Sequence, residues 1–79
     1  MFVIAQNGKQ VLNVDHIREI YCDDRAVNVT WAYKPNGYMA DSVTIGVYHS
    51  ADRAEDVFRL LKSVIMSSPM PQSYKMPKE

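Results

Sequence analysis

The fold is decided within the stretch Val43-Thr44-Ile45-Gly46-Val47-Tyr48-His49-Ser50-Ala51-Asp52-Arg53-Ala54-Glu55-Asp56-Val57. Up to about His49, apolar and polar residues alternate with the period of a β-strand. From Ala51 onward the apolar residues recur at the spacing of an amphipathic helix. Ser50 stands where an N-cap belongs, so we expect the helix to begin at Ala51. The predicted apolar face of this helix consists of Ala54, Val57, Phe58, Leu61, Val64 and Ile65.

The helix should end near Ser67-Ser68-Pro69, because a residue before proline avoids the α-helical conformation. Residues 69–79 carry three of the four prolines and show no apolar period. We therefore expect a single domain over residues 1–68 and a flexible, proline-rich tail over 69–79. The alternative is that Met70, Tyr74 and Met76 dock on the domain or on a partner, since methionines suit adaptable apolar contacts.

Upstream of the deciding stretch, the sequence predicts a first hairpin. Asn7-Gly8 is a strong signal for a type I′ turn between two short strands. A turn at these two residues sets Ile4 opposite Val11 and Val3 opposite Leu12. Both faces of the hairpin therefore carry apolar pairs, which is typical of a hairpin that is covered on two sides.

Two further strands follow, over about 17–22 and 26–33, and a charged turn at residues 23–25 separates them. A second hairpin turn is predicted at Lys34-Pro35-Asn36-Gly37-Tyr38. With a three-residue loop there, Tyr33 faces Met39, Val29 faces Val43 and Val27 faces Ile45. A two-residue loop would mix apolar with polar faces, so we favour the three-residue loop.

These elements predict an α+β fold, in which an antiparallel meander of about five strands is followed by one C-terminal helix packed on the sheet. The residues expected to form the core are Ile4, Val11, Ile20, Val27, Val29, Trp31, Val43, Ile45, Val47, Val57, Phe58, Leu61 and Ile65.

The residues that could carry chemistry do not form a recognisable set. Cys22 is the single cysteine, which excludes an internal disulfide and fits a reducing compartment. His16, His49 and Cys22 have no spacing typical of a zinc site. We expect both histidines to lie on the surface and Cys22 to be a small buried hydrophobe. We expect no cofactor and no metal, and no enzyme activity.

Nine basic and nine acidic residues balance, so no global field attracts nucleic acid or an anionic membrane. The apolar opening is too short for a signal peptide or a membrane span, and we expect a soluble, cytoplasmic protein. Tyr21, Trp31, Tyr33, Tyr38 and Tyr48 could form a stacking platform for bases, but such platforms accompany a basic groove.

The deciding stretch, with its Ile-Gly-x-Tyr-x-Ser-x-x-Arg-Ala-x-x-Val pattern over residues 45–57, resembles small uncharacterised proteins of Gram-positive bacteria and their phages or mobile elements. Asn13-Val14-Asp15-His16-Ile17 is similar to a segment near the start of those proteins. The resemblance covers most of residues 1–66 and implies a fold but no activity. The chain departs from the pattern in its Pro-Asn-Gly loop and proline-rich tail.

The function expected from the sequence is a non-enzymatic interaction module that forms a homodimer. A five-stranded sheet is roughly 20 Å across and one helix only about 10–12 Å wide, so part of one sheet face needs another cover. The expected interface consists of Phe2, Val3, Leu12, Tyr21 and Tyr48. A sheet that curls around the helix is the alternative cover. The alternative function is a nucleic-acid-associated accessory protein of a phage or mobile element.

Overall fold

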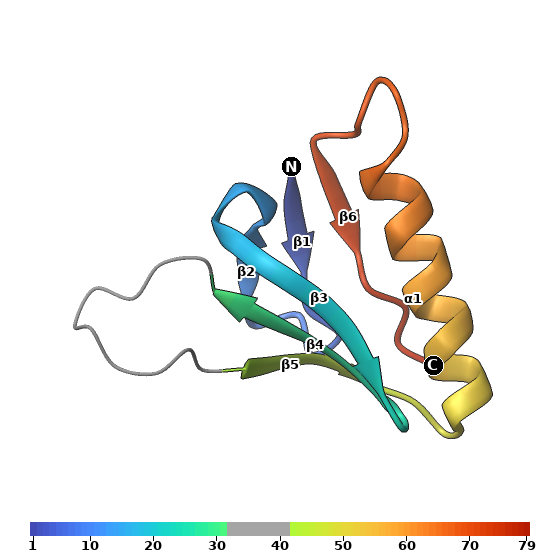
Figure 1. Cartoon of the computed structure of the whole chain (residues 1–79). Coiled ribbons are helices and arrows are strands. Elements are labelled where there is room, and N and C mark those ends of the chain that lie inside the picture. Colours follow the sequence, from blue (N-terminus) through green and yellow to red (C-terminus); the bar gives the residue numbers. More distant parts are fainter. Residues whose placement is uncertain (32–41) are drawn as a thin grey trace.

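A computed structural model describes residues 1–31 and 42–79. Within these ranges the chain forms two three-stranded sheets and one α-helix (Figure 1). The elements are β1 (Phe2–Ile4), β2 (Val11–Asn13), a 3-10 turn (Val14–His16), β3 (Ile17–Asp23), β4 (Ala26–Trp31), β5 (Ser42–Val47), α1 (Ala51–Ile65) and β6 (Ser73–Lys75). The α+β class and the helix after the strands are confirmed, whereas the single five-stranded meander is wrong.

The first sheet is antiparallel and has the order β3-β4-β5. The predicted pairing of Val29 with Val43 is confirmed. Val27, however, faces Gly46 and not Ile45, because the register shifts between Val27 and Asn28. Ile45 is thus the extra residue of a β-bulge, which reverses the alternation of side chains beyond it. The predicted pairing of Tyr33 with Met39 lies outside the described residues.

The second sheet has the order β2-β1-β6. The predicted hairpin register, with Ile4 opposite Val11 and Val3 opposite Leu12, is confirmed. The turn differs from the type I′ prediction. The Gly8 amide donates to the Ala5 carbonyl over 2.8 Å, and the only residue of this turn with a left-handed φ is Gly8, at 72°. The turn therefore centres on Gln6 and Asn7, and Gly8 supplies the left-handed step after it.

β6 lies in the segment predicted to be a flexible tail, and that prediction is wrong. It pairs in parallel with β1, with Val3 opposite Tyr74. Main-chain hydrogen bonds flank the pairing: the Phe2 amide donates to Gln72 over 2.8 Å, and the Met76 amide donates to Ile4 over 2.9 Å. The domain consequently extends past residue 68 and uses the C-terminal segment as a strand.

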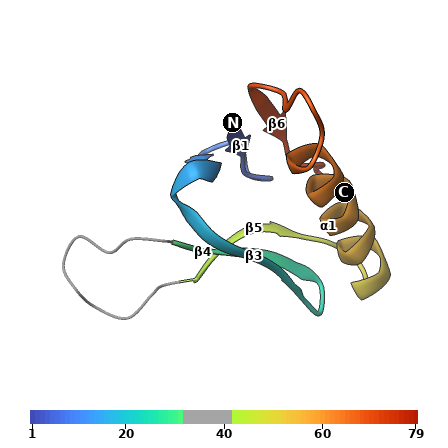
Figure 2. The ribbon, with the colours of Figure 1, turned by 45° about the horizontal axis from the view of Figure 1, so that its top comes forward.

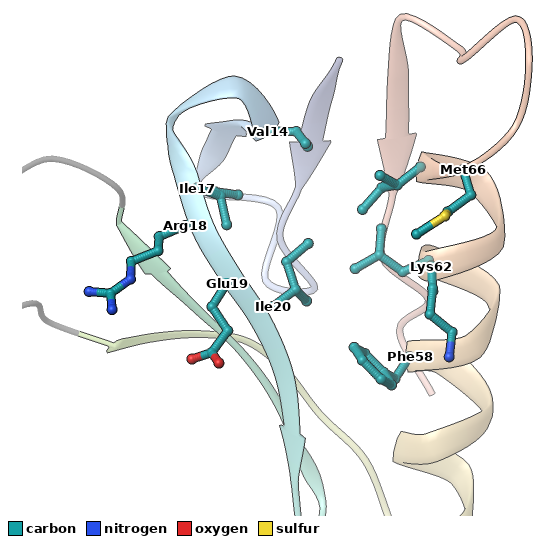
Figure 3. A pocket seen from close by; sticks show the side chains of 10 residues that line it. Val14, Ile17, Arg18, Glu19, Ile20, Phe58, Lys62 and Met66 are labelled. Carbon is teal, nitrogen blue, oxygen red and sulfur yellow. The ribbon is translucent and has the colours of Figure 1, made fainter.

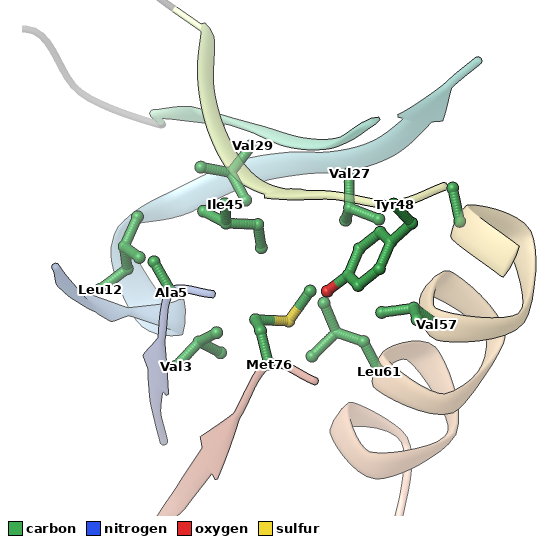
Figure 4. Packing of buried hydrophobic residues seen from close by; sticks show 11 residues of the cluster. Val3, Ala5, Leu12, Val27, Val29, Ile45, Tyr48, Val57, Leu61 and Met76 are labelled. Atoms are coloured by element: carbon green, nitrogen blue, oxygen red, sulfur yellow. The ribbon is translucent and has the colours of Figure 1, made fainter. Parts of the chain in front are cut away.

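The core lies between the two sheets, and α1 closes one side of it (Figure 2, Figure 4). Its buried residues are Val3, Ala5, Leu12, Val27, Val29, Ile45, Tyr48, Ala54, Val57, Leu61 and Met76. The predicted helix face is confirmed, since Ala54, Val57 and Leu61 are buried. Two predicted core residues are wrong, because Val11 is 63% and Val47 54% exposed. The other predicted core residues outside the buried set are half-buried: Ile4, Ile20, Trp31, Val43, Phe58 and Ile65.

The start of α1 follows the prediction. The Ser50 hydroxyl accepts a hydrogen bond from the Arg53 amide over 3.1 Å, which satisfies one of the free amides of the first turn. This cap fixes the start of α1 shortly after β5, and α1 then contacts both β3 and β4.

Candidate functional site

Three of the five residues expected at a dimer interface lie inside the molecule. Val3, Leu12 and Tyr48 are 1%, 3% and 3% exposed, so the prediction for these residues is wrong. Phe2 is 50% exposed. Tyr21 is half-buried, and its hydroxyl is hydrogen bonded to the Ser42 hydroxyl at 2.7 Å.

The hairpin β1–β2 does carry apolar pairs on both faces, as predicted. Val3 and Leu12 form the inner pair, and Ile4 and Val11 form the outer pair beside Phe2. The periodicity of the strands defines the two faces but does not say which one is inside. The outer face of this hairpin, with Phe2, Ile4 and Val11, remains partly uncovered.

The sheet β3-β4-β5 needs no second copy of the chain as a cover for its inner face. The residual face of β3-β4-β5 that α1 leaves open is covered by the sheet β2-β1-β6 of the same chain (Figure 2). Tyr48 takes part in this internal contact, because its hydroxyl donates to the Pro77 carbonyl over 2.9 Å. Any self-association must therefore use a surface that this arrangement leaves exposed.

Such a surface is a groove between β3 and α1, which we call the β3–α1 groove. It encloses about 360 Å³ and is lined by Val14, Ile17, Arg18, Glu19, Ile20, Phe58, Leu61, Lys62, Ile65 and Met66. Figure 3 shows Ile17 and Ile20 pointing from β3 toward α1, and Phe58 facing them from the helix. A second hollow, bounded by Tyr21, Cys22, Glu55 and Arg59, continues the groove and shares Ile20, Phe58 and Lys62 with it.

The walls of the β3–α1 groove are apolar and incompletely covered. Ile17, Ile20, Phe58 and Ile65 are half-buried, and Met66 is 79% exposed. The Lys62 ammonium lies 5.5 Å from the centre of the Phe58 ring, within the range of a cation–π contact. A small-molecule site would need several convergent polar groups. The groove lacks such a set, because the side chains of Arg18 and Glu19 point away from α1 (Figure 3).

One border of the groove is the free edge of a sheet. β3 is the outermost strand in the order β3-β4-β5. Within residues 1–31 and 42–79, no main-chain hydrogen bond links residues 18–23 of β3 to an element other than β4. An uncovered strand edge offers amides and carbonyls to another strand. The groove thus combines apolar walls with a main-chain edge, which are the two elements of strand addition.

The titratable residues singled out from the sequence do not converge. His16 and His49 are both exposed, as expected. Cys22 is a free, half-buried cysteine. Burial, and then the charges of Glu55, Asp23 and Asp24, raise the pKa of the Cys22 thiol. The neutral thiol is therefore favoured, which is the opposite of an activated nucleophile. In the described part of the chain, no three His, Cys, Asp or Glu side chains are grouped to hold a metal ion.

Among the residues that the structure describes, no helix has the length and apolar character needed to cross a bilayer. Comparison of the chain with known protein families, with curated proteins and with solved structures gives no match. The resemblance to small proteins of Gram-positive bacteria and their phages stays a prediction.

Proposed function

We propose that this chain is a small, non-enzymatic protein-interaction module that self-associates, and that the second copy covers the β3–α1 groove. The observation that carries the proposal is the groove itself: half-exposed apolar side chains of β3 and α1 stand beside a free strand edge. Burying such side chains against a partner is favourable by about 25 cal/mol per Å² of apolar surface.

The groove is a better interface than the outer face of the hairpin β1–β2. That face offers Phe2 and Val11, which are 50% and 63% exposed, and it adjoins the edge strand β2, which has only three residues. The groove adjoins the longer edge of β3, a strand of seven residues, so a partner there gains more main-chain hydrogen bonds together with the apolar contacts. A symmetric dimer buries the β3–α1 grooves of both copies at once.

Binding to nucleic acid is the weaker alternative. The chain has no net charge, and two of its arginines contact acceptors within the described residues. Arg59 lies 3.2 Å from Asp56, and Arg53 donates to the Glu79 carbonyl. A nucleic-acid surface requires unpaired cations that displace counterions from phosphates. As part of the proposal we place the protein in the cytoplasm, since its single cysteine, Cys22, is free.

The mass in solution tests the proposal. Sedimentation equilibrium at micromolar concentration should give twice the 9.0 kDa of one chain. Met66→Lys should weaken the dimer, because it places a charge on the exposed wall of the groove. Leu60→Lys is the matched control: Leu60 lies on α1, of which Met66 is the C-cap, and it is 51% exposed but does not line the groove.

A wild-type mass of 9.0 kDa across this concentration range would contradict self-association. Val11→Lys distinguishes between the two candidate interfaces, the outer hairpin face and the β3–α1 groove. If Val11→Lys dissociates the dimer and Met66→Lys does not, the outer hairpin face is the interface and the groove is not. A DNA titration of the wild-type chain, repeated at rising salt, tests the nucleic-acid alternative.

A further inference from the structure

The exposed end of β3 carries a sequence that is complementary to itself in reverse. Ile17-Arg18-Glu19-Ile20 reads apolar, positive, negative, apolar. Antiparallel alignment of two copies about a point between Arg18 and Glu19 sets Ile17 opposite Ile20 and Arg18 opposite Glu19. Opposite charges that face each other on neighbouring strands stabilise their pairing, and so do apolar pairs.

The backbone of β3 also places the side chains of each of these pairs on the same face of the sheet. The pairing of β3 with β4 shifts between Ile17 and Glu19, so Arg18 is an extra residue in β3. Figure 3 shows the result: Ile17 and Ile20 point toward α1, whereas Arg18 and Glu19 both point away from it. The order inward, outward, outward, inward is unchanged on reversal. A second β3 therefore meets the first with every side chain on the matching face.

Two neighbouring registers are less favourable, one because its side-chain faces do not match and the other because like charges meet. Alignment about Ile20 would set the outward Arg18 opposite Cys22, which lies on the inner face opposite buried Val27. Alignment about Tyr21 keeps the faces matched but sets Glu19 opposite Asp23. Because the symmetry repeats this contact, four carboxylates would meet across the strands, which is unfavourable.

Arg18 and Glu19 are both exposed. Among the described residues neither of them forms a salt bridge. We infer that two copies of this chain pair through their β3 edges about a two-fold axis between Arg18 and Glu19. Each charge then meets its opposite on the other copy, while Ile17 and Ile20 of both copies line the joined grooves. This inference rests on the proposed self-association and specifies its geometry.

Charge reversal tests the pairing directly. Arg18→Glu places two acidic side chains at positions 18 and 19, and Glu19→Arg places two basic ones. Each variant alone should dimerise at least about tenfold more weakly than wild type, because like charges then face each other. An equimolar mixture of the two should recover the dimer, since every contact is again between opposite charges. The double variant Arg18→Glu/Glu19→Arg should dimerise as wild type does.

The measurements are sedimentation equilibrium for mass and circular dichroism for folding. Both substituted side chains are exposed, so the variants should remain folded. If each single variant dimerises as tightly as wild type, the β3 pairing is wrong but self-association is not contradicted. Failure of the mixture to recover the dimer also overturns the β3 pairing, because the two charges are then not opposed. A monomeric wild type removes the proposed function itself.

Discussion

Gly46 lies directly beneath the ring of Tyr48. A Cβ atom at position 46 would lie 2.6 Å from the Tyr48 hydroxyl oxygen and 2.8 Å from its Cε2. A glycine inside a strand predicts a bulge or a close approach by another backbone, most simply that of the helix. The close neighbour is instead the Tyr48 side chain, and the absence of a side chain at position 46 admits its ring. The ring in turn is 3% exposed and reaches the C-terminal segment through its bond to Pro77.

We expect Gly46→Ala to destabilise the fold. The added methyl group would displace a packed ring, and such overpacking costs about 1–3 kcal/mol. Urea unfolding followed by circular dichroism measures the loss. Gly8→Asn is the comparison: nothing lies within 4 Å of a Cβ at position 8, and asparagine tolerates its left-handed φ of 72°. A Gly46→Ala midpoint equal to wild type would mean that the Tyr48 ring moves freely aside.

Tyr48 should make stability depend on alkaline pH. Burial, followed by the nearby Tyr74, raises the pKa of the Tyr48 phenol, and Arg53 opposes this by lowering it. The unfolded chain then releases the proton near pH 10, while the folded chain still holds it. The free energy of unfolding therefore falls as the pH rises above about 10, and the full contribution is present below that pH.

The variant that tests this is Tyr48→Phe. At pH 7 it should lose about 0.5–1.5 kcal/mol, because the hydrogen bond to the Pro77 carbonyl is absent. Above pH 10 its unfolding free energy should decline less steeply than that of wild type. Urea unfolding at intervals between pH 7 and pH 11 gives both curves. Parallel curves would show that Tyr48 titrates alike in the folded and unfolded chains.

Local sequence signals predicted much of the fold. The position of the first hairpin turn follows from Asn7-Gly8, and the start of α1 follows from the change of period at Ser50. Each of these features depends on neighbouring residues, so the sequence contains the information. Bulges are different, because one extra residue exchanges the faces of a strand. The bulge at Ile45 places Tyr48 inside and Val47 outside, which alternation alone assigned the other way.

Contacts between distant residues were the part that the sequence could not predict. β6 has three residues, and its partner β1 is about seventy positions away. Prolines on both sides of β6 are typical of a loose tail, and no local pattern indicates a strand there. The groove was missed for the same reason, because β3 and α1 meet only after the chain has closed. The sequence did correctly predict that both faces of the first hairpin carry apolar pairs.

Gln6 should be a sensitive position because its side chain joins three segments. Its Nε2 donates to the carbonyls of Val47 and Lys78, over 2.8 and 2.7 Å, and its Oε1 accepts from the Val47 amide over 2.8 Å. Gln6→Glu keeps the shape but replaces the donor with a carboxylate oxygen facing two carbonyls. We expect a loss of about 1–3 kcal/mol at pH 7.

The same variant has a pH signature. Below about pH 4, protonation of the new carboxyl restores one donor, so the gap between Gln6→Glu and wild type should narrow. Gln10→Glu is the matched control, since Gln10 is exposed and sits in the same hairpin. Urea midpoints at pH 7 and pH 4 provide the comparison. No gap at either pH value would show that the amide donor at position 6 is dispensable, and a large gap that is equal at both would show that protonation does not replace it.

The C-terminal methionines offer the sharpest test of the sixth strand. Met76 is 1% exposed and packs in the core (Figure 4). Met70, in the connection from α1, is 40% exposed. Met76→Ala should cost about 2–5 kcal/mol, because it leaves a cavity among buried residues. Such a loss is a large fraction of the stability of a small domain, so the variant should be partly unfolded at 25 °C. Met70→Ala should change stability by less than about 0.5 kcal/mol. Thermal and urea unfolding measure the stability of both variants. If both lose only a small and equal amount of unfolding free energy, residues 69–79 are the flexible tail that the sequence alone predicted.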